Sequence, residues 1–236
     1  MPNEADITIE KRLVNERRAG IVSSSLRKRN IGVQYVPSRE EALRTVLGMI
    51  PAGTTVARGD SVTVDQLEII PELVKRGQNK LLNPFERDTD GNSVVKPEDR
   101  QKIERETFSA DIFLTGTNAI TLDGKIVSID GGGNRVAAMI YGPSKVIIVV
   151  GVNKIVKDVN QALERIHQIC VPMNAERHAL KHQLPQFKDL PCVMTGKCID
   201  CNHEWRMCRY TIIIDGTMPR DKGRINVILI GDDLGF

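Results

Sequence analysis

The sequence predicts an α/β fold in which helices pack against a mostly parallel β-sheet. Apolar, β-prone segments alternate with helical patterns over most of the chain, and parallel strands need such helices to connect them. Residues 145–151 form an apolar run with a charge only at its entrance, which is typical of a central strand buried on both faces. We therefore expect a ligand to bind at the carboxyl ends of the strands.

Length and composition limit the class of protein. Of the 236 residues, 41% are hydrophobic and 27% are charged, as in ordinary globular proteins. There is no apolar run of the roughly 20 residues that cross a membrane, and the first residues lack the apolar core of a signal peptide. We expect a cytoplasmic protein without membrane contact. We also expect a single domain over 1–236, with 83–96 as an irregular connector and 172–209 as a cysteine-rich insertion.

The charges give little sign of a macromolecular partner. Lys and Arg total 33 against 30 for Asp and Glu, and the two signs are interleaved along the chain. Only 4% of the residues are aromatic, which leaves few rings on which bases could stack. We therefore expect no nucleic-acid binding.

Apolar spacing and capping signals predict the first elements. Apolar residues fall on one stripe at helical spacing over 7–30, so we expect a long helix there, broken near Gly20. A short strand is expected at 31–36. Ser38 is followed three positions later by Glu41, and this capping box predicts the start of the next helix.

A strand, a turn and a helix come next in the chain. Residues 54–57 predict a buried strand and 58–61 a glycine-containing turn, and a helix begins near Thr63. This order of elements is the local shape that binds anions, because a helix N-terminus presents free N–H groups. After the connector we expect a helix over 97–108, with proline at its first position.

The second half of the chain predicts a hairpin and further strands. Asp-Gly at 123–124 lies between two β-prone runs, which is a strong hairpin signal. Strands 210–215 and 225–230 are expected to join the main sheet, because a pair this short is marginal alone. The other elements expected here are a strand at 110–115, a hairpin pairing 118–122 with 125–129, a helix starting at 136–141, and a helix over 158–171.

Glycine-rich loops indicate a binding site for a small anion. Glycines after a strand and before a helix let backbone N–H groups approach a negatively charged ligand. Arg135 stands at a helix N-terminus, where a cation is disfavoured, so we expect its guanidinium to grip a carboxylate or phosphate. The alternative is that the glycines only form tight turns and that Arg135 pairs with Asp130. The candidate ligand-binding residues are Gly59, Asp60, Ser61, Thr63, Thr115, Gly116, Thr117, Asn118, Asp123, Gly131, Gly132, Gly133, Asn134 and Arg135.

Four of the five cysteines share one segment and indicate a metal site. Cys192, Cys198, Cys201 and Cys208 include one C-x2-C pair, and four thiolates are the ligand set of structural zinc and of iron–sulfur clusters alike. The spacing is not the usual motif of either class, so an iron–sulfur cluster, zinc, and free or redox-paired thiols all stay open. His203 lies between two of the cysteines and is an alternative ligand.

Several other motifs are absent from the sequence or weak. It contains no dinucleotide fingerprint, no P-loop and no nucleophile elbow, so we expect no NAD. His178 and His182 stand four positions apart, a spacing that can bind metal. Because the sequence offers no third ligand nearby, we expect them on a solvated helix face.

Three stretches of the chain closely resemble the lactate-utilisation (LUD) domain family. They are Thr115-Gly-Thr-Asn-Ala-Ile-Thr-x-Asp-Gly, Gly133-Asn-Arg-Val-Ala-Ala-Met-Ile-Tyr-Gly-Pro, and Val149-Val-Gly-Val-Asn-Lys-Ile-Val. The resemblance covers nearly the whole chain, and the cysteine segment is similar to the tail of a stand-alone bacterial and archaeal branch. It implies a Rossmann-like sheet with helices on both faces, similar to glucosamine-phosphate isomerase, ribose-phosphate isomerase and CoA-transferases. It also implies a link to oxidation of L-lactate to pyruvate, in which a LUD protein acts beside iron–sulfur subunits.

Three functional hypotheses follow. The first is a protein of lactate or related 2-hydroxy acid oxidation that binds a small anionic substrate and works with iron–sulfur protein partners. The second is a redox or metal-sensing module built on the thiols. The third is an isomerase or a CoA- or folate-linked transferase, whose nucleophile would be Asp60, Asp123 or Asp130. Catalysis by this chain itself and formation of homo-oligomers are left open.

Overall fold

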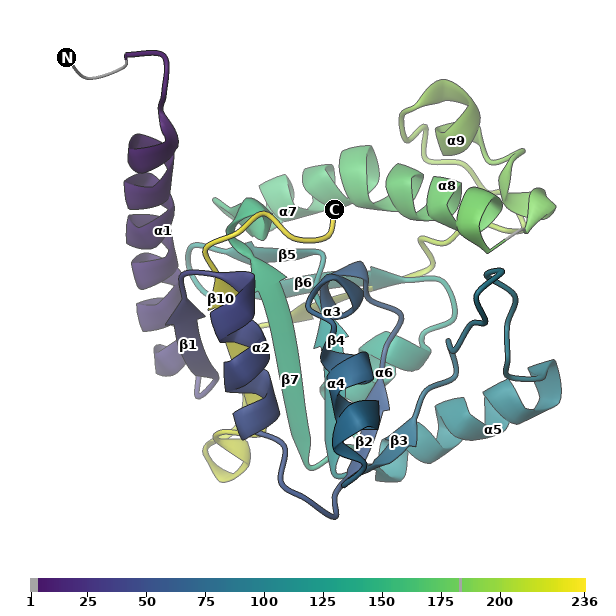
Figure 1. Ribbon diagram of the computed structural model, residues 1–236. Coiled ribbons are helices and arrows are strands. Elements are labelled where there is room, and N and C mark those ends of the chain that lie inside the picture. Colours follow the sequence, from purple (N-terminus) through teal and green to yellow (C-terminus); the bar gives the residue numbers. More distant parts are fainter. Residues whose placement is uncertain (1–3, 183) are drawn as a thin grey trace.

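A six-stranded, all-parallel β-sheet forms the centre of the protein. The computed structural model describes residues 4–182 and 184–236, and Figure 1 shows the strands of this sheet side by side. Their order is β1-β10-β7-β4-β2-β3, and each neighbouring pair is parallel, which confirms the predicted α/β class. The strands are β1 (Gly32–Val36), β2 (Thr55–Arg58), β3 (Lys80–Leu82), β4 (Ile112–Gly116), β7 (Lys145–Gly151) and β10 (Ile225–Ile230).

Strand β7 explains why the sheet is covered on both sides. Successive side chains of a strand point to opposite faces, so Val146, Ile148 and Val150 enter one core cluster while Ile147 and Val149 enter the other. All five side chains are fully buried. Each such burial stabilises the fold by about 1.5–3 kcal/mol, and the apolar run therefore requires cover on both faces.

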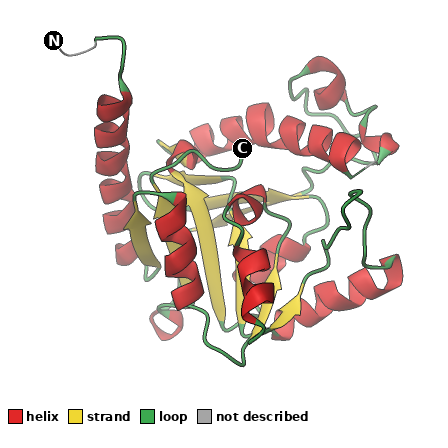
Figure 2. Ribbon diagram, in the orientation of Figure 1, coloured by secondary structure: helices red, strands yellow, loops and turns green. Residues whose placement is uncertain are grey.

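Helices supply most of this cover, as Figure 2 shows. One face packs against α1 (Thr8–Lys28) and α6 (Asn134–Ile140). The opposite face packs against α2 (Arg39–Gly48), α3 (Val62–Gln66) and α4 (Ile69–Arg76).

The predicted cap at the start of α2 forms, but α1 has no break. The hydroxyls of Ser38 and Ser61 accept backbone N–H bonds and cap α2 and α3. The expected break near Gly20 is wrong, because α1 runs through it without interruption. Its buried stripe includes Val22 and Leu26, and the packing of this stripe outweighs the cost of about 1 kcal/mol for glycine inside a helix.

A second, four-stranded sheet packs against the same face as α1. Its order is β8-β5-β6-β9, and the β5–β6 pairing is antiparallel with Ile120 opposite Ile126, which confirms the predicted hairpin. Of the two last strands, only β10 joins the main sheet; the expectation for the other is wrong, because β9 pairs with β6. The main sheet takes the buried strand, whereas β9 leaves residues exposed at an edge. The strands are β5 (Ala119–Thr121), β6 (Ile126–Asp130), β8 (Ile155–Val156) and β9 (Tyr210–Ile214).

A helical run longer than expected covers the outer face of this second sheet. It consists of α7 (Val159–Arg165), a π-helical turn at Ile166–Cys170 and α8 (Val171–Lys181). The predicted end at residue 171 is wrong, because the proline at 172 sits in the first turn of α8, where its missing N–H costs little. The segment 172–209 therefore begins inside a helix, which Figure 1 shows above the upper end of β7.

The remaining segments are mainly irregular. The connector 83–96 contains one isolated bridge, between Arg87 and Ser93, and leads into α5 (Pro97–Glu106).

No helix among the described residues combines the length and the apolar character needed to span a bilayer. The other elements are α9 (Pro191–Thr195) and the 3-10 turns Thr107–Ser109, Val152–Lys154, Pro185–Phe187 and Pro219–Asp221.

Candidate functional site

A cavity of about 430 Å³ opens at the carboxyl ends of the parallel strands. The loops that follow β2, β4 and β7 reach it, as do the start of α6 and one side of α8. This is the edge at which open α/β sheets bind ligands, and the volume is in the range of small-molecule sites. The predicted ligand-binding residues that line it are Asp60, Ser61, Thr63, Gly116, Thr117, Asn118, Gly131, Gly132, Asn134 and Arg135.

Three further predicted residues lie just behind the cavity wall. A Cβ on Gly59 would come within 3.0 Å of Arg135 Cγ and of Thr115 Oγ1, so this glycine and Thr115 make room for the arginine. Gly133 precedes α6 with φ of 85°, a left-handed conformation that favours glycine. These residues shape the site without lining the cavity.

Asp123 is placed elsewhere. It lies in the hairpin turn and forms ion pairs with Arg29, at 3.3 Å, and with Lys125, at 3.3 Å. The hydroxyl of Thr121 and these cations lower the pKa of Asp123. Its role is to fasten the hairpin to the end of α1, and we leave it out of the site.

Arg135 does not offer the free guanidinium that we expected. Its Nε donates to Asp130 Oδ1 at 3.3 Å and its Nη1 to the Gly116 carbonyl at 3.1 Å. Its Nη2 donates to Asn118 Oδ1 at 3.2 Å and to the Ile129 carbonyl at 2.6 Å. The donors are thus spent on the protein, so the clamp interpretation is replaced by the alternative, in which Arg135 pairs with Asp130 and fixes the loops.

Lys154 is the cation that sequence reasoning missed. It follows β7, is 4% exposed and lines the cavity. Its Nζ donates to Thr63 Oγ1 at 3.0 Å, and within the described residues no carboxylate pairs with it. Burial lowers the pKa of Lys154 to about 7; Cys170 opposes this effect, and the guanidinium groups of Arg165 and Arg135 add to it.

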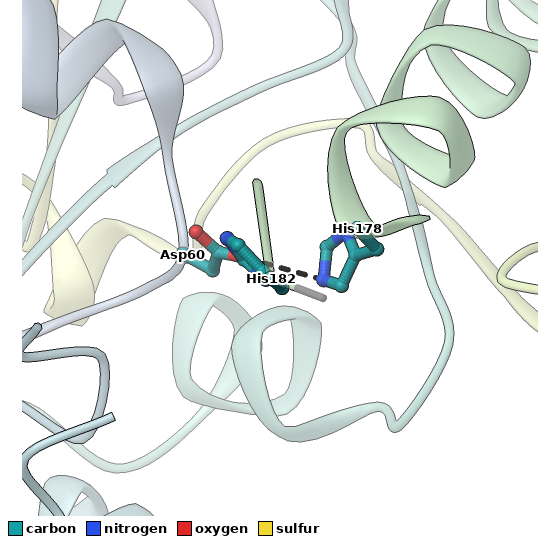
Figure 3. A group of neighbouring side chains, drawn as sticks. All are labelled: Asp60, His178 and His182. Carbon is teal, nitrogen blue, oxygen red and sulfur yellow. Dashed lines mark ion pairs between the residues drawn. The ribbon is translucent and has the colours of Figure 1, made fainter. Parts of the chain in front are cut away.

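The cavity is also lined by an acid, Asp60, and by His178, and His182 lies next to them; Figure 3 shows the three side chains pointing toward one another. Asp60 forms a short ion pair with Arg177, and its Oδ2 lies 3.6 Å from His178 Nε2. Burial alone would raise the pKa of Asp60, but the Arg177 guanidinium outweighs it and holds the pKa below the usual value. Burial lowers the pKa of His178, and that of His182 to about 3. The pair is therefore neutral near pH 7, and the expected solvated face is wrong for His178.

The three candidate nucleophiles of the third hypothesis are all engaged. Asp60 pairs with Arg177, Asp123 with Arg29, and Asp130 with Arg135. A carboxylate held by a guanidinium is a weaker nucleophile than a free one, because its charge is already compensated. The structure thus offers no support for nucleophilic attack by these groups.

The four clustered cysteines, hereafter the thiol set, are all free and lie around α9 and the loop after it. Cys192 is buried, and burial raises its pKa, with Cys201, Cys208 and Cys198 adding to the effect. His167, from the π-helical turn, places Nδ1 at 3.2 Å from Cys198 Sγ. The alternative ligand that we expected, His203, instead accepts the Trp205 N–H.

Comparisons with known proteins agree with this architecture. A family model described as LUD domain matches residues 21–230. A DUF162 family protein from Deinococcus radiodurans is similar in structure, with a TM-score of 0.51 at 14% identity over 92% of this chain and 98% of that chain.

A weaker likeness is to eIF2B delta from Chaetomium thermophilum, with a TM-score of 0.33 at 17% identity over 53% of this chain and 50% of that chain. Another is to ribose 5-phosphate isomerase from Plasmodium falciparum, with a TM-score of 0.32 at 18% identity over 50% of this chain and 52% of that chain. A comparison with curated proteins gave no match. At 14% identity the first of these likenesses shows a shared fold alone.

Replacing Arg135 by lysine tests its structural role. Lysine keeps the charge but cannot reach all the acceptors, so we expect the free energy of unfolding to fall by about 1–3 kcal/mol, the cost of buried acceptors left unpaired. Urea unfolding measures this loss. The matched control is Arg220→Lys, at an exposed ion pair, which should change stability by less than about 0.5 kcal/mol. Equal effects of the two substitutions would contradict the role of Arg135.

Replacing Lys154 by methionine tests the low pKa. The folded chain loses this proton at about pH 7, whereas the unfolded chain keeps it until near pH 10.4. Between these values the unfolded state binds more protons, so Lys154 makes the free energy of unfolding rise with pH, by up to about 1.4 kcal/mol per unit. Lys154→Met should remove this rise. Parallel stability curves for the two proteins over pH 7.5–9.5 would show that the amine titrates normally.

Proposed function

Because the chain belongs to the LUD domain family, we propose that it takes part in oxidation of lactate or a related 2-hydroxy acid and binds the acid's carboxylate in the cavity at the strand ends. The family model spans 210 residues, from 21 to 230, so the family's link to lactate use applies to the body of this protein. We place it in the cytoplasm with iron–sulfur proteins as partners, as that link implies.

The observation that carries this proposal is the uncompensated charge of Lys154. A buried ammonium group is costly unless it is paired, and the partner that Lys154 has is the neutral hydroxyl of Thr63. The guanidinium groups of Arg165 and Arg135 also disfavour the charged form of Lys154, although Asp130 compensates the charge of Arg135. A bound anion would pair with the buried ammonium group and offset the positive charge around it, which favours a negatively charged ligand over a neutral one.

Hydroxyl and amide groups surround the point where Lys154 enters the cavity. Ser61 caps α3 and Thr63 lies in its first turn, and Gly116 comes from the end of β4. A Cβ on Gly116 would lie 2.7 Å from Ser61 Oγ, so glycine is what lets these two loops meet. A carboxylate in this corner can accept bonds from the ammonium group and from both hydroxyls.

The thiol set supports a second role, as a metal or iron–sulfur site. Each thiol of Cys198, Cys201 and Cys208 acts on the pKa of Cys192, but among the described residues no three of the four sulfur atoms lie within 4.8 Å of one another, so a bound ion or cluster would have to draw them together. His167 lies in contact with one of them. In either form the site would stand beside the cavity wall, because Cys192 and Cys208 pack in the same apolar cluster as α8.

Ligand titration of the full chain tests the first proposal. We expect isothermal titration calorimetry to detect L-lactate or pyruvate but not lactamide, which lacks the carboxylate charge. Because the protonated amine is the binding form, affinity should fall by up to tenfold per pH unit above about pH 7. Proton uptake, measured in buffers of different ionisation enthalpy, should accompany binding in this range.

Two lysine variants test whether the positive charge that binds the ligand is that of Lys154. Lys154→Met should weaken binding by about 10–100-fold, since a hydrogen bond to a charged group contributes about 1.5–3 kcal/mol. The exposed Lys157 is the matched control, and Lys157→Met should bind as the parent does. The proposal would be refuted if the affinity for lactate changed neither with pH nor in Lys154→Met, or if lactamide bound as tightly as lactate.

Metal analysis of anaerobically purified protein tests the thiol set. We expect either iron with the visible absorption of sulfide-to-iron charge transfer, or zinc without colour. Cys201→Ser should lower the metal content, while Cys170→Ser, a cysteine outside the thiol set, should not. Folded protein that is colourless and free of metal under these conditions would rule out this role.

A further inference from the structure

We infer that Asp60, His178 and His182 form a binding site for a divalent transition-metal ion, separate from the thiol set. In the described part of the chain they are the one group of three metal-ligating side chains whose ligand atoms all lie within 4.8 Å of one another. Figure 3 shows the acid, from the loop after β2, facing the two rings at the end of α8.

The spacing suits a single ion. Zinc binds imidazole nitrogen and carboxylate oxygen at about 2.0–2.2 Å, and tetrahedral ligands at that range are about 3.4 Å apart. The Asp60 Oδ2 to His178 Nε2 distance is 3.6 Å, so these two atoms already stand at nearly the separation that an ion between them requires. The four-residue spacing of the histidines on one helix turns both rings to the same side.

The histidines are prepared as ligands. His178 Nδ1 lies 2.9 Å from the Asn174 carbonyl, and a proton on that nitrogen leaves Nε2 with a free lone pair toward Asp60. Metal-binding histidines commonly donate their other N–H to a backbone carbonyl in this way. The ring centroids of His178 and His182 are 4.3 Å apart, a separation at which two charged rings would repel each other.

Arg177 is compatible with this site. Its short contact is with Asp60 Oδ2, and a carboxylate has lone pairs to spare for an ion on either oxygen. Ligating carboxylates are themselves usually hydrogen-bonded, which orients them. Two imidazoles and one carboxylate select zinc, iron(II), cobalt(II) or nickel(II) over magnesium and calcium, which prefer oxygen ligands alone.

The location ties the ion to the cavity. Asp60 and His178 both line the cavity that receives Lys154, and three protein ligands leave at least one coordination position open. The hydroxyl oxygen of a 2-hydroxy acid would occupy an open position while its carboxylate binds at Lys154. This coupling rests on the proposed function, whereas metal binding itself does not.

Cobalt(II) titration of the full chain tests the site without any acid present. Nitrogen and oxygen ligation should give visible d–d absorption without near-ultraviolet thiolate-to-cobalt charge transfer, whereas cobalt in the thiol set would show both. His178→Ala and His182→Ala should each lower the affinity for cobalt(II), measured from the d–d absorption, by at least about 10–100-fold. Losing a residue that only hydrogen-bonds to a metal ligand already costs this much. His203→Ala, a histidine outside the cluster, should leave it unchanged.

Asp60→Asn separates this site from a simple pair of helical histidines. If three ligands hold the ion, this variant should lose affinity as the histidine variants do, with folding checked by circular dichroism. A parent affinity that survives in Asp60→Asn, or in folded His182→Ala, would overturn the assignment, as would the absence of d–d absorption in the parent chain. Failure of L-lactate to bind in the same samples would count against the proposed function alone.

Discussion

The site depends on Arg135, which fastens the two sheets together where their loops meet. Its guanidinium bonds the Gly116 carbonyl at the end of β4 and the Ile129 carbonyl in β6, and it pairs with Asp130. One planar group thus holds the main sheet, the second sheet and the start of α6 in fixed positions. Because its five donors are set in a rigid fork, the loops around the cavity share one geometry instead of moving separately.

This fastening determines the charge balance of the cavity. Asp130 compensates Arg135, and Asp60 compensates Arg177, so two of the cations near the cavity are neutralised by neighbours. Lys154 has no such partner among the described residues and is buried. The result is a cavity with an unpaired positive charge at Lys154 and, elsewhere along its lining, an acid beside the neutral ring of His178. A ligand with an anionic end for Lys154 and a hydroxyl for the ion that we propose at Asp60 fits both groups.

The sequence predicted most of the loops around the cavity and every strand of the central sheet except the three-residue edge strand β3, because these follow from local patterns. Strand β7 is apolar throughout, and glycines mark the turns that precede α3 and α6. The prediction that Arg135 grips a ligand was wrong. Its guanidinium bonds backbone carbonyls of Gly116 and Ile129, whose positions depend on tertiary structure. The roles of Lys154 and Asp60 could not be predicted for the same reason. Lys154 is distinguished by its burial, and Asp60 by its contact with a histidine more than a hundred residues away in the sequence.

The helical run from α7 to α8 explains why these distant parts form one site. The residues of this run that line the cavity are Cys170, Val171, Asn174, Arg177 and His178. They follow the helical period, so they form a single stripe, and the next position of that stripe is His182. In the π-helical turn between α7 and α8, His167 contacts Cys198 of the thiol set. Within the described structure one helix therefore touches the cavity, the Asp60–His178–His182 cluster and the thiol set, so a shift of this helix on binding at one of them would change the geometry of the other two.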